Sequence, residues 1–246
     1  MKLAVISDIH GNIAALEATL ADIGRRGISE IVNLGDCLSG PFDAVATAER
    51  LMSLQLPTVR GNHDRALYDR PRDEMGTWEQ WVIDDLNSAH IDWLQSFPMT
   101  LRIGGALLCH ATPEKDDQNW LEYRGKERRL IARDLKDIAV HSADADAELI
   151  LCGHTHVPRV VRLPDGPTIA NPGSVGCPAY LDTRTSPHFI HQMGSPDARY
   201  AIVEAQEDSF QVDLISVPYD ASEMAELARK KGAESWAQAV TTGWFA

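Results

Sequence analysis

The sequence lacks several features that would place it in a common class of protein. No stretch approaches the roughly 18 consecutive apolar residues that a membrane-spanning helix needs, so we expect no membrane partner. The first residues, Met1 to Asp8, hold a short apolar run without the long apolar segment and small-residue cleavage site of a signal peptide. A cytoplasmic protein is the simplest expectation, and neither an internal repeat nor a low-complexity tract is visible.

Cysteine and positive charge are scarce. The four cysteines show no CxxC pair, and a chain of 246 residues does not need disulfides for stability. We interpret them as reduced thiols in the core, with a thiolate-rich zinc site near Cys37, Cys109 and Cys152 as the alternative. Lysine and arginine total 23 against 36 aspartate and glutamate residues, a net charge of −13. Such a surface repels polyanions, which argues against duplex nucleic acid as a partner.

What the sequence does contain is enough apolar residues, 44%, for one sizeable core and a single domain over residues 1–246. Up to about residue 60, short β-rich runs, namely the one within residues 1–8 and those at 31–34 and 57–60, alternate with amphipathic helical segments. This alternation is typical of βαβ units with a largely parallel sheet. Later hairpin signals, among them Gly104-Gly105, predict antiparallel pairs.

Three further segments break this alternation. Tryptophan, leucine and phenylalanine residues between about 65 and 98 predict a helical insertion that ends at Pro98. Residues 177–198 are rich in proline, threonine, serine and histidine, and they predict a long exposed loop. The chain from Tyr219 onward is predicted to be helical.

Polar side chains follow the predicted strands. Asp8 and His10 leave the first strand on the same side, because residues i and i+2 of an extended segment point the same way. His154 and His156 repeat this geometry after a later strand. Other polar residues at strand exits are Asp36, Asn62 and His110. The carboxyl ends of strands in open α/β sheets are where ligands bind, so these side chains can converge there. Oxygen and nitrogen ligands without thiolate suit Mn, Fe, Zn or Ni.

The order of these motifs resembles a known family. The motifs are Asp8-x-His10, Gly35-Asp36, Gly61-Asn62-His63-Asp64, His110 and Gly153-His154-x-His156. They are similar to the D-x-H, G-D, G-N-H-[DE], H and G-H-x-H series of the calcineurin-like metallophosphoesterase superfamily, over residues 1 to about 176. The segment Asn171 to Gly176 resembles the small bacterial and archaeal phosphodiesterase branch that includes the YfcE-type proteins.

This resemblance implies an α/β fold in which two mixed β-sheets pack as a sandwich flanked by helices, in four layers. It also implies two divalent metal ions. One ion would be held by Asp8, His10 and His156, the other by Asn62, His110 and His154, with Asp36 as a bridge. The sequence departs from the family pattern after His110, where Ala111 replaces the usual glycine and makes a positive φ costly.

The residues also predict a mechanism. Two cations that share a bridging water can lower its pKa, so that the resulting hydroxide attacks the phosphorus in line while the cations clamp the phosphoryl oxygens. His63, next to Asn62, is predicted to protonate the leaving oxygen, and Asp64 is predicted to orient the His63 ring and keep it charged.

Two residues are predicted to touch substrate. Asn12 either caps the helix that follows it or reaches the substrate, and capping is the simpler interpretation. Arg199 lies beside the 177–198 segment, where cations can meet phosphate. The same segment also contains Arg184, His188 and His191. The simpler interpretation of all four residues is that they are solvated loop residues without a contact to substrate.

Together these features predict a hydrolase for a phosphodiester or phosphomonoester of a small molecule or nucleotide. A protein phosphatase or a dinucleoside polyphosphate hydrolase is the alternative within enzymes, because the same metal pair serves all of them. A rival from another class is a protein-interaction scaffold that keeps the fold and the metals without catalysis. The presence of His63 argues against the scaffold, and a homo-oligomer is left open.

Overall fold

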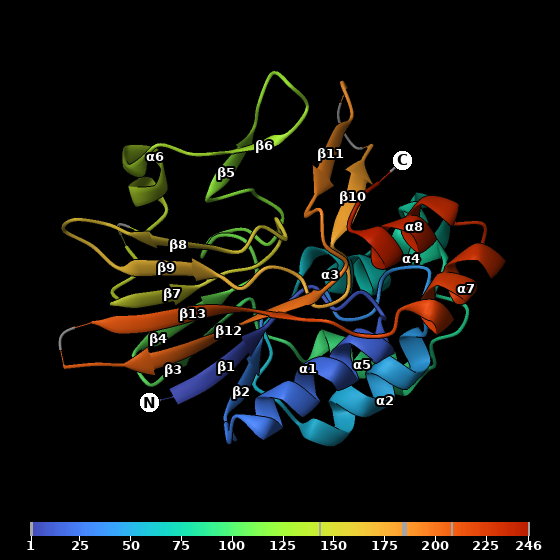
Figure 1. Ribbon diagram of the computed structural model, residues 1–246, viewed down its shortest axis with the longest axis horizontal. Helices are drawn as coiled ribbons and strands as arrows, with labels where there is room; N and C mark the ends of the chain where they lie inside the picture. Colours follow the sequence, from blue (N-terminus) through green and yellow to red (C-terminus); the bar gives the residue numbers. More distant parts are fainter. Residues whose placement is uncertain (1, 143, 184–185, 208, 246) are drawn as a thin grey trace.

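Two mixed β-sheets form the centre of the molecule (Figure 1). The computed structural model describes residues 2–142, 144–183, 186–207 and 209–245. The first sheet has the order β13-β12-β1-β2. Its strands are β1 (Lys2–Ile6), β2 (Ile31–Asn33), β12 (Ala198–Ala205) and β13 (Phe210–Val217). β1 pairs parallel with β2 and antiparallel with β12, so the two halves of the chain meet along one strand.

The second sheet has the order β3-β4-β7-β9-β8. Its strands are β3 (Thr100–Ile103), β4 (Ala106–Cys109), β7 (Leu149–Leu151), β8 (Arg159–Arg162) and β9 (Thr168–Asn171). The central strands β4, β7 and β9 are parallel, whereas the outer pairs β3–β4 and β8–β9 are antiparallel hairpins. The β3–β4 hairpin turns at Gly104-Gly105, as predicted.

The sheets pack face to face through alternating apolar side chains. Leu3 and Val5 of β1 share one core with Leu108 of β4 and Leu149 and Leu151 of β7, because alternate residues of a strand point to the same face. The outer face of the first sheet packs on α1 (Ile13–Arg25) and α2 (Ala44–Leu54). The predicted sandwich of two mixed sheets is confirmed.

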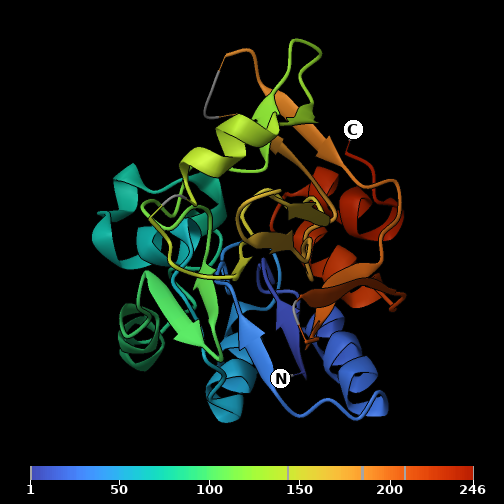
Figure 2. The same ribbon diagram turned by 90° about the vertical axis from the view of Figure 1, so that its left-hand side faces the viewer.

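The outer face of the second sheet is covered differently. Two loop residues, Trp120 and Leu121, pack against it together with Ile138 of α6 (Leu135–Val140). Beside them lies a two-stranded ribbon, β5 (Glu122–Arg124) with β6 (Leu130–Ala132). Figure 2 shows this ribbon and α6 at the top of the molecule and the blue helices at the bottom, with the two sheets between them.

Four short helical segments occupy the predicted insertion: α3 (Asn62–Asp69), the 3₁₀ turn η1 (Arg72–Glu74), α4 (Thr77–Gln80) and α5 (Ser88–Gln95). The C-terminal segment is helical as predicted, in α7 (Ser222–Lys230) and α8 (Glu234–Thr242). Within the described ranges, no helix has the length and apolar character needed to cross a membrane.

The predicted strand at 57–60 is wrong. Only an isolated bridge between Thr58 and Asn33 forms there. Pro57 lacks an N–H group, and α3 begins at Asn62, so too few residues remain for a ladder.

The predicted exposed loop at 177–198 is also wrong. It contains the hairpin β10 (Ala179–Asp182) and β11 (Phe189–Gln192). Tyr180 and Phe189 are buried in one cluster with Trp236 of α8, because alternate residues of the hairpin face that helix. The polar composition hides this short alternation. Arg184 lies outside the described residues.

Candidate metal centre

The polar residues after the strands meet at one end of the sandwich. Two groups have ligand atoms that all lie within 4.8 Å of one another inside each group, and every member is buried. The first group is Asp8, His10 and His156, and the second is Asp36, His110 and His154. Their donor atoms are carboxylate oxygens and imidazole nitrogens, a set that suits divalent first-row metal ions. The two groups adjoin each other, because His110 Nε2 of the second group lies 4.0 Å from Asp8 Oδ1 of the first.

The backbone at these positions is strained. Five non-glycine residues of the two groups have φ between 52° and 69°: Asp8, His10, Asp36, His154 and His156. Such left-handed conformations cost about 1 kcal/mol or more each, and they persist where the surrounding structure holds them. Strain of this kind, repeated within one buried cluster, is typical of a functional site.

Two motif glycines allow the backbone to approach the carboxylates. A Cβ atom at Gly61 would lie 2.0 Å from Asp36 Oδ1, and one at Gly153 would lie 2.1 Å from Ser7 Oγ. Both distances are far below van der Waals contact. The glycines of the G-N-H and G-H-x-H motifs are therefore required for close packing rather than for a turn.

Hydrogen bonds orient three of the imidazoles. In each, Nδ1 donates to a backbone carbonyl, so Nε2 is the nitrogen that faces the cluster. The pairs are His10 with Ser39 at 2.7 Å, His110 with Leu34 at 2.7 Å and His156 with Cys177 at 2.9 Å. The Nε2 atoms of His10 and His156 lie 3.3 Å apart.

Asp8 has one oxygen that accepts no hydrogen bond from the described residues and whose neighbour is His156 Nε2 at 3.3 Å. Its Oδ2 accepts from Ser7 Oγ at 2.6 Å and from the His154 N–H at 3.2 Å. Its Oδ1 is buried and, within the described part of the chain, accepts no hydrogen bond. A buried carboxylate oxygen without a donor is costly unless a cation compensates it. The residues present therefore fit a metal ion.

The charges of the cluster favour cation binding. Burial opposes ionisation of Asp8, but His156 outweighs it and lowers the pKa of Asp8 to about 2. Burial, together with His156, lowers the pKa of His10 to about 3, which keeps this ring neutral. Burial opposes the charged form of His110, but Asp36 outweighs it and raises the His110 pKa to about 10. The carboxylates are thus anionic, and a cation would compete with the His110 proton for Asp36.

Asn62 lies at the edge of the second group. One atom of its amide is 2.9 Å from His154 Nδ1 and 3.2 Å from the carbonyl oxygen of Asp116. As an oxygen, this atom could share a cation with His154. As a nitrogen, it would donate hydrogen bonds to both neighbours.

His63 is held by the insertion rather than by Asp64. Its Nδ1 forms a short hydrogen bond with the carboxylate of Glu79, and its ring stacks on Trp78 at 4.7 Å and 12°. Both neighbours belong to the one-turn helix α4. The side chain of Glu79 is 3% exposed and that of His63 is 16% exposed, so a solvent-facing edge remains on the histidine.

The predicted role of Asp64 in orienting His63 is wrong. Asp64 stands at the third position of α3, and its carboxylate turns back to the start of the helix. It accepts the N–H groups of Asp36 and Cys37 at 2.8 Å and of Gly61 at 3.0 Å. Burial, with the nearby Asp36 charge, raises the pKa of Asp64 to about 6. Asp64 therefore holds the two loops together.

Sequence reasoning missed Glu79. It lies sixteen residues after His63, inside a segment with no recognisable motif, and only the packing of α4 on α3 brings the two together. The sequence gives no signal for this contact, because the insertion holds several acidic residues and nothing in its pattern distinguishes Glu79 from the others.

The predicted substrate contact of Asn12 is not supported. Its Oδ1 accepts the N–H of Ala15 at 3.0 Å, which confirms the helix cap. Its Nδ2 donates to the Gly176 carbonyl and the Tyr219 hydroxyl. The amide is buried and has no donor left for a substrate.

Arg199 lies outside both groups. Its guanidinium donates to the carbonyl oxygens of Ser195 and Asp197. It is buried against its own loop, so a contact with substrate stays a prediction.

The cysteines are free and buried. Burial raises the pKa of the Cys37, Cys109 and Cys152 thiols, which disfavours thiolate. Neither metal-binding group contains a cysteine. The interpretation as core residues is confirmed, and the zinc–thiolate alternative is not supported.

An aromatic wall, formed by Trp78, Tyr180 and Trp236, stands beside the first group. Trp78 packs edge-on to His10 at 5.2 Å, and Tyr180 lies 4.9 Å from His156. Trp78 also contacts Trp236 at 4.7 Å and Tyr180 at 5.7 Å. Three segments far apart in the sequence thus cover one side of the centre.

Comparison with known proteins agrees with this geometry. A model of the calcineurin-like phosphoesterase superfamily domain matches residues 1–194. An uncharacterized protein of Methanocaldococcus jannaschii is 28% identical over 260 residues, which cover 95% of this chain and 94% of that protein.

Two crystal structures are similar over their whole length. A metallophosphoesterase from Sphaerobacter thermophilus matches with a TM-score of 0.76 and 26% identity, covering 99% of this chain and 100% of that one. A hypothetical protein from Pyrococcus horikoshii OT3 matches with a TM-score of 0.74 and 17% identity, covering 100% of this chain and 99% of that one. The second likeness shows the fold alone. The narrower resemblance to the YfcE-type branch stays a prediction.

Proposed function

Because this chain belongs to the calcineurin-like phosphoesterase superfamily, it is a metal-dependent phosphoric ester hydrolase. We propose that its substrate is a phosphodiester or phosphomonoester of a small molecule or nucleotide. We further propose that hydrolysis takes place at a centre for two divalent metal ions. The observation that carries this proposal is the pair of adjoining, buried Asp and His groups with three imidazole Nε2 atoms oriented into them.

The metal ligands follow from the two groups. We assign Asp8, His10 and His156 to one ion and Asn62, His110 and His154 to the other, with Asp36 between them. When bound, two divalent cations supply Lewis acidity, which neutralises phosphoryl charge and lowers the pKa of a water. The carbonyl oxygens that accept from the Nδ1 atoms keep the imidazoles in the tautomer that ligation needs.

His63 is the proposed proton donor to the leaving oxygen. Glu79 engages Nδ1, so Nε2 is the ring nitrogen that would transfer a proton. The stacked indole of Trp78 limits rotation of the ring. Glu79 is therefore a positioning residue in this proposal, in the role that the sequence suggested for Asp64.

A metal titration tests the proposal. We expect the chelator-treated protein to be inactive on bis(p-nitrophenyl) phosphate and added Mn²⁺ to restore hydrolysis, with two ions bound per chain by calorimetry. A panel of phosphate esters under the same conditions then ranks diesters, monoesters, dinucleoside polyphosphates and phosphopeptides. Two bound ions without hydrolysis of any ester would favour the scaffold alternative, and no metal binding would reject the centre.

A further inference from the structure

A buried glutamate contacts the loop that carries two of the proposed metal ligands. Glu122 is the first residue of β5, and its side chain is 1% exposed. One carboxylate oxygen accepts the Thr155 hydroxyl at 2.8 Å, and the other accepts Arg159 Nε at 2.5 Å. Glu122 belongs to neither metal-binding group. A carboxylate is costly to bury even with such partners, so its position between them calls for a reason.

Thr155 stands between two ligands that belong to different groups. His154 is in the second group and His156 in the first. Both have a left-handed backbone, with φ of 69° and 60°. Residues with a Cβ atom keep this conformation only where the surrounding structure holds it. Because the peptide planes on both sides of Thr155 are rigid, a side chain fixed at this position restrains both neighbours at once.

The Thr155 hydroxyl is engaged within the protein. It donates its one proton to Glu122 and accepts a hydrogen bond from Asn171 Nδ2 at 3.1 Å. The same Asn171 amide donates to the Gly153 carbonyl at 2.7 Å, at the start of the loop. Thr155 is 3% exposed, so neither its hydroxyl nor Glu122 is open to substrate. These contacts indicate a role in positioning the loop.

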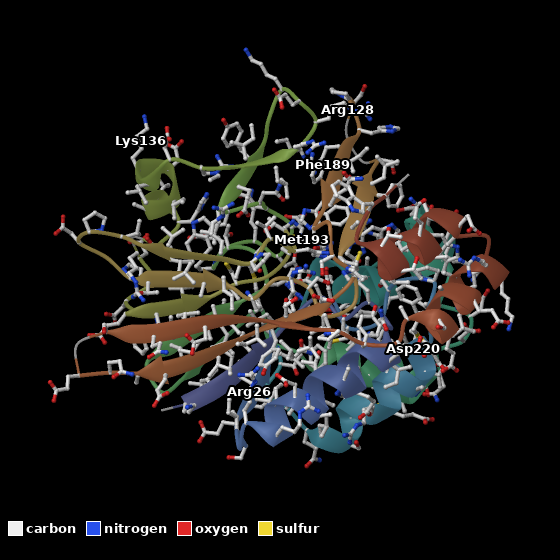
Figure 3. The ribbon with its side chains drawn as sticks, viewed as in Figure 1. Arg26, Arg128, Lys136, Phe189, Met193 and Asp220 are labelled. Atoms are coloured by element: carbon white, nitrogen blue, oxygen red, sulfur yellow. The ribbon has the colours of Figure 1, made fainter. Side chains whose placement is uncertain are left out.

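The element that carries Glu122 is held from two sides. Arg159 of β8 binds the carboxylate to the second sheet. The β5–β6 ribbon is also attached to the β10–β11 hairpin, because Arg128 Nε in the ribbon's turn donates to the His188 carbonyl at 2.5 Å. Figure 3 shows Arg128 beside the hairpin strand that carries Phe189. Glu122 therefore connects the ligand loop to elements that are themselves fixed.

We propose that Glu122 is a positioning residue that acts through the Thr155 hydroxyl to hold His154 and His156 in their two metal-binding groups. This inference rests on the proposed two-metal centre. The hydrogen bond lies between the two ligands, so its loss allows the loop to relax from the left-handed conformation and displaces both imidazoles. Both ions should then bind more weakly, rather than one of them alone.

Substitutions at Thr155 separate the hydroxyl from packing. Thr155→Val keeps the branched shape without the hydroxyl, and Thr155→Ser keeps the hydroxyl without the methyl group. Glu122→Gln keeps the size of the side chain but replaces one acceptor oxygen with an amide donor. Thr19→Val on α1 is the matched control, because Thr19 is likewise buried and its hydroxyl donates to the Ala15 carbonyl.

The measurement is Mn²⁺ calorimetry on chelator-treated protein. We expect Thr155→Val to bind both ions about 10–100-fold more weakly, the range found for partners that orient metal ligands from outside. Glu122→Gln should weaken both ions in the same direction. A variant with both substitutions should lose no more than Thr155→Val alone, because the two residues act in one contact.

The controls distinguish positioning from a general loss of stability. Thr155→Val and Thr19→Val each lose one buried hydrogen bond, so their melting temperatures should fall by similar amounts. Only Thr155→Val should lose metal affinity, whereas Thr19→Val and Thr155→Ser should stay within about three-fold of the wild type. If circular dichroism shows that Thr155→Val does not fold, Glu122→Gln against Thr19→Val makes the same comparison.

Three outcomes would overturn the inference while the wild-type protein binds two ions. They are an unchanged Mn²⁺ affinity in Thr155→Val, an equal loss in Thr155→Ser, and a loss confined to one ion. A wild-type protein that binds no Mn²⁺ would instead reject the proposed centre, and this inference with it. A wild-type protein that binds two ions but hydrolyses no ester would reject the proposed catalysis alone, because the comparison of affinities does not depend on turnover.

Discussion

The two candidate metal-binding groups and the aromatic wall beside them are built in different ways. Almost every member of the groups lies within a few residues of a strand end, as Asp8 does after β1 and His110 after β4. The wall takes Trp78 from the insertion, Tyr180 from a hairpin and Trp236 from the C-terminal helix α8. One region is positioned by local backbone, the other by packing between distant segments.

This difference separates two kinds of function. The strained loops at Asp8, His10 and Asp36 hold charged or ligating atoms within fixed distances, which is what metal chemistry requires. The wall and the side chain next to it, Glu79, shape the surroundings of that chemistry. Substitutions in the first region should therefore abolish turnover, whereas those in the second should reduce it.

The largest expected effect tests the metal-binding groups. Asp36→Asn removes the charge that lies between the two groups, and each cation contributes several kcal/mol to catalysis, so we expect kcat/KM to fall on the order of 10³-fold. Calorimetry should then detect fewer than two Mn²⁺ ions per chain. Asp137→Asn, at an exposed site on α6, is the control and should retain both ions. Full activity in Asp36→Asn would remove this residue from the centre.

The next effect tests the boundary between the two regions. His63→Ala removes the proposed proton donor and leaves all proposed ligands in place, so kcat should fall about 10²–10³-fold while two metal ions still bind. The loss should be smaller for substrates whose leaving group needs no proton, such as p-nitrophenolate, than for alkyl leaving groups. The exposed His188→Ala serves as the control. A uniform loss across leaving groups would argue that His63 binds substrate instead.

A smaller effect is expected where the insertion supports the chemistry. Glu79→Gln keeps the size of the side chain but weakens its hold on His63 Nδ1, and supporting partners of this kind are worth about 10–100-fold. The decrease should appear in kcat and depend on the leaving group as in His63→Ala. The exposed Glu74→Gln in the same insertion should have no effect. If a variant with both substitutions loses no more activity than His63→Ala alone, Glu79 acts through His63.

The smallest effect lies outside both regions. Burial opposes ionisation of Asp22 on α1, but the Tyr200 hydroxyl and the Arg25 and Arg26 guanidinium groups hold its pKa below the usual value. A carboxyl group with a lowered pKa stabilises the fold above its unfolded pKa of about 4, and this contribution is lost as the pH falls through the folded pKa.

Asp22→Asn should therefore reduce the free energy of unfolding by about 1 kcal/mol at pH 7 and by less at pH 3, with unchanged activity. Urea unfolding at the two pH values measures this. A pH-independent difference would show that packing rather than charge carries the effect.

The sequence predicts one part of the site well. Asp8-x-His10 follows β1 and His154-x-His156 follows β7, so each motif lies at a strand end as predicted. The two strands belong to different sheets, and the packing of the sheets brings the motifs together. The prediction for Asp64 from its place next to His63 is wrong, because the Asp64 carboxylate accepts the backbone N–H groups of Asp36, Cys37 and Gly61 and not the His63 ring.

Two segments show why other predictions failed. Residues 57–60 contain the β-branched pair Thr58-Val59, which favours a strand, but Pro57 and the early start of α3 leave only one bridge. Residues 177–198 look like a solvated loop, yet Tyr180, Phe189 and His191 are buried because α8 packs against the hairpin. The four-residue strands of this hairpin lack the glycine turn signal that marks the β3–β4 hairpin, so the sequence does not predict it.

By itself the sequence determined that the aspartate and histidine side chains of the candidate centre follow strands, because the pattern of each strand predicts where it ends, whereas the sandwich of two mixed sheets was implied by the family resemblance. Only the tertiary structure decided which side chains stand around that centre. The Glu79 contact with His63 and the position of His191 beside His156 depend on how an insertion, a hairpin and a C-terminal helix pack together, and no local periodicity specifies that packing.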